Sequence, residues 1–225
     1  MENRISAIIP AYNEATRIGA TLSALTPLVL IFESIVIDDG SSDDTTSVAE
    51  HHGASRVLRL ERNSGKGAAL NEGLKHATGD ILLFLDADLG ETAGEAIRLL
   101  TPVVGGKADM TIAVLPRPAK KGGMGFVVRA ARDGIERATG RRFESPLSGQ
   151  RALTRELMNS IGQVEERFGV EVALTIDALR VGARVLEVPA AFRHRETGRD
   201  LRSFVHRWRQ WRDVKKAVRA RLRSP

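Results

Sequence analysis

The stretch DILLFLDADLG (residues 80–90) is an apolar run that ends in two acids, Asp86 and Asp88. Its apolar residues follow one another without polar ones between them, which is typical of a strand buried on both faces of a sheet. Side chains at positions i and i+2 of a strand share a face, so we expect both carboxylates to point to one place. Acids at that spacing repel each other unless a cation lies between them, and oxygen ligands suit Mg²⁺ or Mn²⁺. One acid could instead cap the next helix, but a cap does not require two.

Other short runs of apolar and β-branched residues lie along the chain, with helical patterns between them. These runs cover residues 5–10, 34–39, 56–60, 109–115 and 184–189. The pattern predicts an α/β fold with a mostly parallel sheet flanked by helices. We expect one domain over residues 1–200 and a basic amphipathic helix over residues 201–225.

The composition narrows the class of protein. The chain has 225 residues and no cysteine, so neither a disulfide framework nor thiolate chemistry is available. Its start lacks the layout of a signal peptide, and no run approaches the roughly 18 apolar residues of a membrane span. We therefore expect a cytoplasmic protein, and the alternative is a cytoplasmic protein that binds peripherally to the inner face of the membrane.

The charge is concentrated at the end of the chain. The net charge is +6, but residues 193–225 contain 12 basic and 3 acidic residues, which leaves the first 192 residues at −3. A basic tail of this kind favours phosphate-bearing partners. As a helix it has an apolar stripe among arginines, which suits a membrane interface, while packing on the domain or on the second subunit of a homodimer is equally consistent. The stripe consists of Leu201, Phe204, Val205, Trp208, Trp211 and Val218.

Polar clusters follow two of the other predicted strands. Tyr12, Asn13 and Glu14 follow the first strand, and Asp38 and Asp39 follow the second. Ligands of doubly wound sheets bind at the carboxyl ends of the strands, which places these clusters in one candidate site with the two later acids. Taken singly, the first cluster can be a helix cap and the second a turn.

The stretch NSGKGAALNEG (residues 63–73) is rich in glycine and contains Lys66. It has neither the spacing of a P-loop nor that of a dinucleotide-binding loop. A loop that opens a helix could still bind an anion through free amides and this lysine, and a purely structural loop is equally consistent.

In order and spacing, these segments resemble family 2 type nucleotide-sugar glycosyltransferases of the GT-A fold, a group that includes dolichyl-phosphate mannose synthases and glucosyl-3-phosphoglycerate synthases. The matching segments are IIPAYNEA, IVIDDGSSDDT, NSGKGAALNEGLKHATGDILLFLDADL, SGQRALTRE and FGVEVALTIDALRVGARVLEVPAAFRHRETGRD. The resemblance implies a Rossmann-like GT-A domain that uses Mg²⁺ or Mn²⁺. It also implies transfer of a hexose from a UDP- or GDP-sugar to a small phosphorylated or polyprenyl-phosphate acceptor.

The resemblance also assigns roles to the matching positions. It implies a nucleotide site formed by Pro10, Ala11, Tyr12, Glu14, Asp39, Lys66, Asp86 and Ala87. It implies metal ligands Asp86, Asp88 and His194, and catalytic residues Glu171, Asp88 and Lys66. It implies acceptor contacts from Ser148, Gly149, Gln150, Arg193, Arg195 and Arg199.

Two of these assignments have alternatives. His194 can be an ordinary surface histidine in a basic loop. Glu171 would act as the base if the reaction inverts the anomeric centre, and the stereochemistry is open; as a plain helix residue it would instead pair with Arg167 at i−4.

Two further functions compete with glycosyl transfer. A nucleotidyltransferase that makes sugar nucleotides would carry a glycine-rich basic loop after the first strand, where this chain has AYNEA. A non-catalytic module that binds nucleotides or polyanions is disfavoured by the paired acids, the acidic body and the few aromatic residues, so we expect no nucleic-acid partner. The chain lacks the Q-x-x-R-W motif of processive synthases and membrane helices, which argues against a polymer-extruding enzyme.

Overall fold

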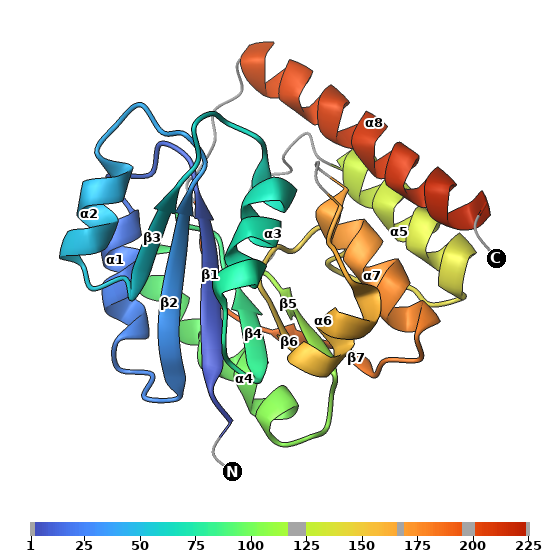
Figure 1. Ribbon diagram of the computed structural model, residues 1–225. Coiled ribbons are helices and arrows are strands. Elements are labelled where there is room, and N and C mark those ends of the chain that lie inside the picture. The colour runs from blue at the N-terminus through green and yellow to red at the C-terminus, as the bar shows by residue number, and fades with distance from the viewer. Residues whose placement is uncertain (1–2, 117–124, 166–168, 195–200, 224–225) are drawn as a thin grey trace.

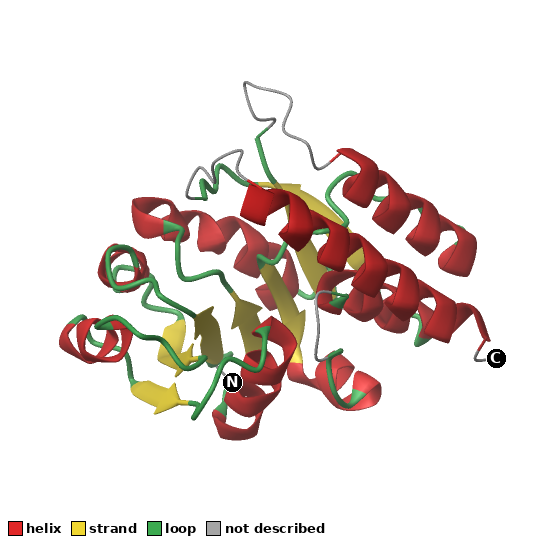
Figure 2. Cartoon of the chain, turned by 90° about the horizontal axis from the view of Figure 1, so that it is seen from above, coloured by secondary structure: helices red, strands yellow, loops and turns green. Residues whose placement is uncertain are grey.

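The chain forms a seven-stranded mixed sheet with helices on both faces (Figures 1 and 2). The computed structural model describes residues 3–116, 125–165, 169–194 and 201–223, and of residues 201–210 and 223 only the backbone. The strands are β1 (Ile5–Ala11), β2 (Ile31–Asp38), β3 (Arg56–Arg59), β4 (Ile81–Phe84), β5 (Met110–Val114), β6 (Arg151–Thr154) and β7 (Val185–Pro189). The helices are α1 (Ile18–Leu25), α2 (Thr45–His51), α3 (Lys66–His76), the 3-10 helix η1 (Gly90–Glu95), α4 (Ala96–Val104), α5 (Gly125–Thr139), α6 (Arg155–Ile161), α7 (Val170–Arg180) and α8 (Leu201–Arg223).

The predicted α/β fold is confirmed, and each of the predicted strand runs overlaps a strand, although β2 begins three residues before the predicted run 34–39. Strand β6 was not predicted, because its four residues follow a turn-rich stretch and include a charged residue, Arg151. It nevertheless lies inside the sheet, between β4 and β5, with which it pairs antiparallel. The sheet is therefore mixed rather than uniformly parallel.

The strand directions bring distant parts of the chain to one edge of the sheet. The strand order is β3-β2-β1-β4-β6-β5-β7, and β1 to β4 run parallel where they pair. Since β6 is antiparallel to both of its neighbours and β7 is parallel to β5, the ends of β4 and β7 and the start of β6 lie at the same edge. Residues that follow β2, β4 and β7, or precede β6, can therefore meet there.

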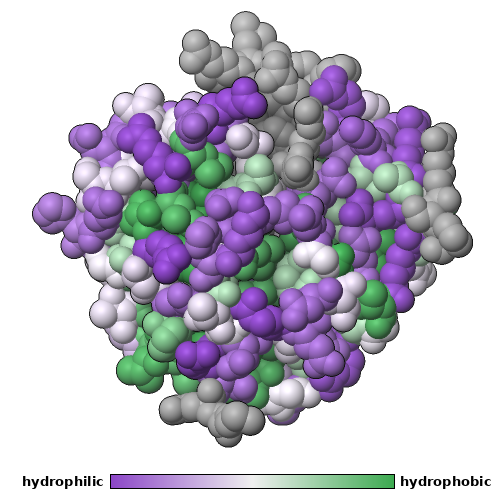
Figure 3. Space-filling view, in the orientation of Figure 1, coloured by the Kyte–Doolittle hydropathy of each residue, from purple (hydrophilic) through white to green (hydrophobic). Residues whose placement is uncertain are grey.

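Each face of the sheet has its own hydrophobic core. Ile9 belongs to the core that α1 and α4 cover, whereas Ile8 belongs to the core covered by α3, α5, α7 and α8. Adjacent residues of one strand are thus buried on opposite faces, which explains the uninterrupted apolar runs in the sequence. In the space-filling view, hydrophilic side chains cover much of the outer surface, with hydrophobic ones between them in separate patches (Figure 3).

The second half of α8 packs on the domain. Val214, Ala217 and Val218 are each less than 5% exposed, and α8 lies along α5 and α7 (Figure 1). Arg221 forms a two-pronged ion pair with Asp177 of α7, at 2.6 and 2.7 Å. Packing on the domain therefore accounts for this half of the helix. The other predicted stripe residues, Leu201, Phe204, Val205 and Trp208, lie outside the described side chains, and none of the described helices is long and apolar enough to cross a membrane.

Candidate active site

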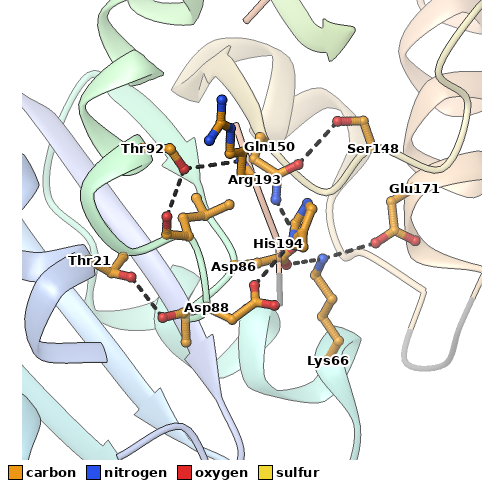
Figure 4. Close-up of polar contacts among 12 residues, drawn as sticks. Thr21, Lys66, Asp86, Asp88, Thr92, Ser148, Gln150, Glu171, Arg193 and His194 are labelled. Carbon is orange, nitrogen blue, oxygen red and sulfur yellow. Dashed lines mark hydrogen bonds and ion pairs between the residues drawn. The ribbon is translucent and has the colours of Figure 1, made fainter. Parts of the chain in front are cut away.

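The two acids of the opening stretch lie beyond their strand. Strand β4 ends at Phe84, so the expectation that Asp86 and Asp88 share a face of a strand is wrong. A turn between β4 and η1 holds both acids instead, and Thr21 of α1 fixes that turn. Its hydroxyl donates to the carbonyl of Ala87 at 2.8 Å (Figure 4). The same hydroxyl accepts from the amide of Gly90 at 2.8 Å.

Asp86 is held by two donors from distant segments. Lys66 Nζ, from the first residue of α3, lies 2.5 Å from Oδ1, and Gln150 Nε2 donates to Oδ2 at 2.6 Å. Burial on its own would raise the pKa of the Asp86 carboxyl, but the charges of Lys66 and His194 and these two hydrogen bonds lower it below its usual range. Asp86 is therefore an ionised carboxylate at neutral pH.

His194 lies beside both acids. Its Nδ1 is 3.0 Å from Oδ1 of Asp88 and 3.8 Å from Oδ2 of Asp86. The segment after β7 is fastened to the region around η1, where the amide of Arg193 donates to Thr92 Oγ1 at 3.1 Å. Burial would lower the pKa of His194, but its hydrogen bond to Asp88 and the two carboxylate charges raise it. An ordinary surface histidine would not require these contacts with Asp88 and Asp86, so the geometry favours the role of a metal ligand for His194.

Asp86, Asp88 and His194 together fit a divalent cation. Each offers one ligand atom, and these atoms all lie within 4.8 Å of one another. Carboxylate oxygens suit Mg²⁺ and Mn²⁺, and an imidazole nitrogen favours a transition-metal ion such as Mn²⁺. The chemistry of this donor set therefore matches the predicted cofactor.

Glu171 faces the acids from the opposite side of Lys66. It is the second residue of α7, its side chain is 13% exposed, and its Oε1 lies 3.1 Å from Lys66 Nζ (Figure 4). Burial would lower the pKa of the Lys66 ammonium, but the charges of Asp86 and Glu171 raise it above its ordinary value. One lysine thus bridges the candidate metal ligand and the candidate base. Arg167, the alternative partner of Glu171, lies outside the described residues.

The proposed nucleotide residues gather along the same edge. Asp39 is buried, and its two oxygens accept from the backbone amides of Ser64 at 2.7 Å and Gly65 at 2.8 Å. This carboxylate therefore orders the loop that leads to Lys66, and its predicted contact with a nucleobase stays a prediction. Tyr12 is 47% exposed, a large side chain free to meet a ligand. Of the other predicted members, Ala11 and Ala87 are buried, and Pro10 and Glu14 are partly buried.

The proposed acceptor residues before β6 turn toward Asp86. Gln150 is fully buried, donates to Asp86 and accepts from the hydroxyl of Ser148 at 3.2 Å. Gly149 lies so close that an added Cβ would stand 2.2 Å from Lys66 Nζ. These contacts support a role in orienting Asp86 and Lys66, and acceptor contact stays a prediction. Arg193 is exposed, and its guanidinium points away from Asp86 and Lys66 (Figure 4); Arg195 and Arg199 lie outside the described residues.

Three residues that support the site were missed in the sequence. Thr21 fixes the turn that holds the acids, and Thr92 fastens the segment that leads to His194. Arg151 is buried and donates to the carbonyl of Ser148 in the loop before β6. Each is a single polar residue inside an otherwise ordinary stretch. What identifies them is their contacts with residues that lie 24 to 101 positions away along the chain.

The sequence comparison identifies the family. The family model for glycosyl transferase family 2 matches residues 6–147, and the chain belongs to this family. The predicted recognition is thereby confirmed, and the solved structure described below confirms the GT-A fold.

Curated and solved relatives agree with this result. The chain is 31% identical over 201 residues to glycosyltransferase AglJ of Haloferax volcanii, and 30% identical over 218 residues to an undecaprenyl-phosphate 4-deoxy-4-formamido-L-arabinose transferase of Klebsiella pneumoniae. The matches cover 87% and 90% of this chain but 65% and 63% of the relatives, so it spans less than two thirds of their length. The crystal structure of glucosyl-3-phosphoglycerate synthase from Mycobacterium tuberculosis, in complex with Mn²⁺, uridine diphosphate and phosphoglyceric acid, superimposes with a TM-score of 0.81 at 30% identity, over 99% of this chain and 80% of the other.

Proposed function

We propose that this protein is a metal-dependent hexosyltransferase that moves a sugar from a UDP- or GDP-sugar to a phosphate-bearing acceptor, either a small phosphorylated molecule or a lipid phosphate. The observation that carries the proposal is the meeting of Asp86, Asp88, His194, Lys66 and Glu171 at one edge of the sheet. Membership of glycosyl transferase family 2 supports the reaction class.

The proposed donor-side and acceptor-side roles fall on opposite sides of Lys66, with Asp86 on one side and Glu171 on the other. Held by Asp86, Asp88 and His194, a divalent cation would neutralise the charge that develops on the departing diphosphate. Lys66 would add a fixed positive charge at the same place, because its ammonium stays protonated between two carboxylates. Its 3.1 Å contact with Glu171 places that carboxylate across the lysine from Asp86, where it would accept a proton from an acceptor hydroxyl or orient the acceptor.

Two observations support the proposed acceptor class: the names of the relatives and the basic residues that follow β7 in the sequence. One relative is named for an undecaprenyl-phosphate substrate, and the solved neighbour holds phosphoglyceric acid. Both molecules carry phosphate, and in this chain Arg193, Arg195 and Arg199 would bind an acceptor phosphate by charge-assisted hydrogen bonds. A lipid-phosphate acceptor would bring the protein to the inner face of the membrane, where the basic residues of α8 would meet anionic headgroups.

A binding experiment tests the donor site first. The melting temperature is measured with UDP, GDP and their sugars, each with and without Mn²⁺, in the wild type, in Asp88→Asn and in Asp133→Asn as a control on the exposed face of α5. A ligand that binds only the folded state raises the melting temperature with the logarithm of its concentration. We expect a Mn²⁺-dependent shift with one nucleotide in the wild type and in Asp133→Asn, and its loss in Asp88→Asn.

The bound donor is then offered 3-phosphoglycerate or a short-chain polyprenyl phosphate, and sugar transfer is followed by mass spectrometry. Transfer to one of the two identifies the acceptor class. An equal shift with and without the metal, or no shift with any nucleotide, would contradict the proposal.

A further inference from the structure

Arg151 is a charged side chain at the centre of the sheet. It begins β6, pairs with Phe84 of β4 and Ile112 of β5, and is 1% exposed. Burying a guanidinium is costly unless its hydrogen bonds are made. An apolar residue would fill this position at less cost, so the arginine suggests a task beyond filling the core.

The guanidinium of Arg151 connects two segments of the site. Its Nε donates to the carbonyl of Ser148 at 2.9 Å and its Nη2 to that of Pro146 at 3.5 Å, while its Nη1 donates to the hydroxyl of Thr175 at 2.9 Å. The Thr175 hydroxyl in turn donates to the carbonyl of Glu171 at 2.7 Å. Arg151 therefore holds the loop before β6 with one part of its fork and the first turns of α7 with the other.

These two segments supply opposite neighbours of Lys66. The loop brings Gly149 against Lys66 and Gln150 onto Asp86, and α7 brings Glu171 to within 3.1 Å of Lys66. A shift of either segment would change the separation of the groups that act on the donor and on the acceptor. Misplacement of about 1 Å at reacting groups can cost on the order of a hundredfold in rate.

The side chain is charged in this position. Burial lowers the pKa of Arg151 to about 10, while the carboxylates of Glu171 and Glu187 act in the opposite direction. At neutral pH the guanidinium keeps its protons, and all of its N–H donors stay available to the carbonyls and to Thr175. Glu187 also holds the start of the same loop by accepting from the amides of Glu144 at 2.8 Å and Ser145 at 2.6 Å.

We propose that Arg151 is a positioning residue for glycosyl transfer, which holds the loop at residues 146–150 and the first turns of α7 so that Lys66, Asp86 and Glu171 meet. This role rests on the proposed function. It acts through the backbone of its neighbours and not by contact with a substrate.

The chain offers a matched control in Arg155. It directly follows β6, and its Nε and Nη2 donate to the carbonyls of Gly79 at 2.6 Å and Ala77 at 2.9 Å, at the opposite end of the strand from the site. Arg155→Met thus removes the same kind of bond from a region without the candidate catalytic residues. Arg151→Met removes the proposed clamp, and Arg151→Lys keeps the charge and part of the hydrogen bonding.

Two measurements separate the outcomes. Hydrogen exchange of the free protein should rise in residues 144–150 and in residues 170–176 of Arg151→Met, whereas in Arg155→Met it should rise around residues 77–80. With the donor identified by the binding experiment, we expect kcat of Arg151→Met to fall about tenfold or more, with a smaller change in the donor KM, and Arg151→Lys to recover part of the loss.

Equal losses of kcat in Arg151→Met and Arg155→Met would show general destabilisation and overturn the positioning role. Unchanged exchange in residues 170–176 would also overturn it, without any assay of activity. If Arg151→Met does not fold, Arg151→Lys carries the same test. If the wild type transfers no sugar, the proposed function fails, while exchange still decides whether Arg151 links the two segments.

Discussion

Lys66 and Asp86 meet directly under the backbone of Gly149. The lysine Nζ lies 2.5 Å from Oδ1 of Asp86, and an added Cβ at residue 149 would stand 2.2 Å from this Nζ and 3.1 Å from both oxygens of Asp86. The contact leaves no room for a side chain at that position. Glycine is therefore required here by close approach, and not by an unusual backbone angle.

Gly149→Ala should displace Lys66 without unfolding the protein. The far end of the lysine can move without unfolding the protein, but two carboxylates lose their ion pair, so we expect the free energy of unfolding to fall by about 1–3 kcal/mol. Donor binding and transfer should fall about tenfold, which corresponds to about 1.4 kcal/mol, because the ammonium leaves both carboxylates. Chemical denaturation and steady-state kinetics check the two halves of this prediction. Full activity in Gly149→Ala would show that the Lys66–Asp86 contact does not matter for function.

His194→Ala should weaken Mn²⁺ binding. Removal of one of three protein ligands leaves the two carboxylates, so we expect the affinity for Mn²⁺ to fall at least about tenfold, in the range found when groups around metal sites are altered. Titration of the apo protein followed by electron paramagnetic resonance measures free Mn²⁺ directly. His51→Ala, at an exposed position of α2, is the control. Equal affinities in the two variants would return His194 to the role of a surface histidine.

Glu33→Gln should lower the free energy of unfolding at neutral pH, and it should lower it by a smaller amount at acidic pH. Glu33 Oε1 accepts from the Ser6 hydroxyl at 2.7 Å and from the amide and hydroxyl of Thr78 at 2.7 and 2.8 Å, which fastens β2 to β1 and to the segment before β4. Burial would raise the pKa of Glu33, but these hydrogen bonds and the charge of Arg56 lower it below 4.5. A lowered folded-state pKa means that the stabilisation is present above pH 4.5 and is lost as the pH falls through the folded-state pKa.

The measurement is urea denaturation of the wild type and Glu33→Gln between pH 7 and pH 3. We expect a difference in the free energy of unfolding of about 1.5–3 kcal/mol at pH 7, the range for hydrogen bonds to a charged group, and a smaller difference at pH 3. The exposed Glu61→Gln serves as the control and should match the wild type at both ends. A difference between wild type and Glu33→Gln that stays constant over the pH range would contradict an ionised Glu33.

Gly134→Ala should loosen α8 from α5. An added Cβ at Gly134 would lie 2.5 Å from a methyl group of Val218, which is buried in the interface. Overpacking of this kind typically costs about 1–3 kcal/mol. Gly125→Ala, at the start of the same helix, adds a Cβ with no atom within 4 Å and should be neutral or slightly stabilising. Thermal denaturation compares the two. A neutral Gly134→Ala would mean that the helices separate at little cost.

The strands that are buried on both faces were predictable because apolar runs such as ILLF leave a local signal. The acids after them were predictable as a group because parallel strands end at one edge. Strand β6 was not predictable, because Arg151 and Thr154 make its four-residue sequence look polar. Its antiparallel direction also leaves no signal in the local sequence. The sequence could not decide what α8 packs against, because an amphipathic stripe looks the same whether it contacts a membrane, a second subunit or its own domain. In the structure, residues 211–222 pack on the domain.

The sequence by itself determined the family, the α/β architecture and the residue types that can bind a metal and a phosphate. It did so because these depend on neighbours in the chain: continuous apolar runs, glycine-rich turns and acids two positions apart. Only the tertiary structure decided that Lys66 contacts both Asp86 and Glu171, and that His194 contacts Asp88, 106 positions away along the chain. It also decided that Arg151 donates a hydrogen bond to Thr175 of α7. Those contacts depend on strand order and direction, which bring the starts and ends of distant strands together at a single edge.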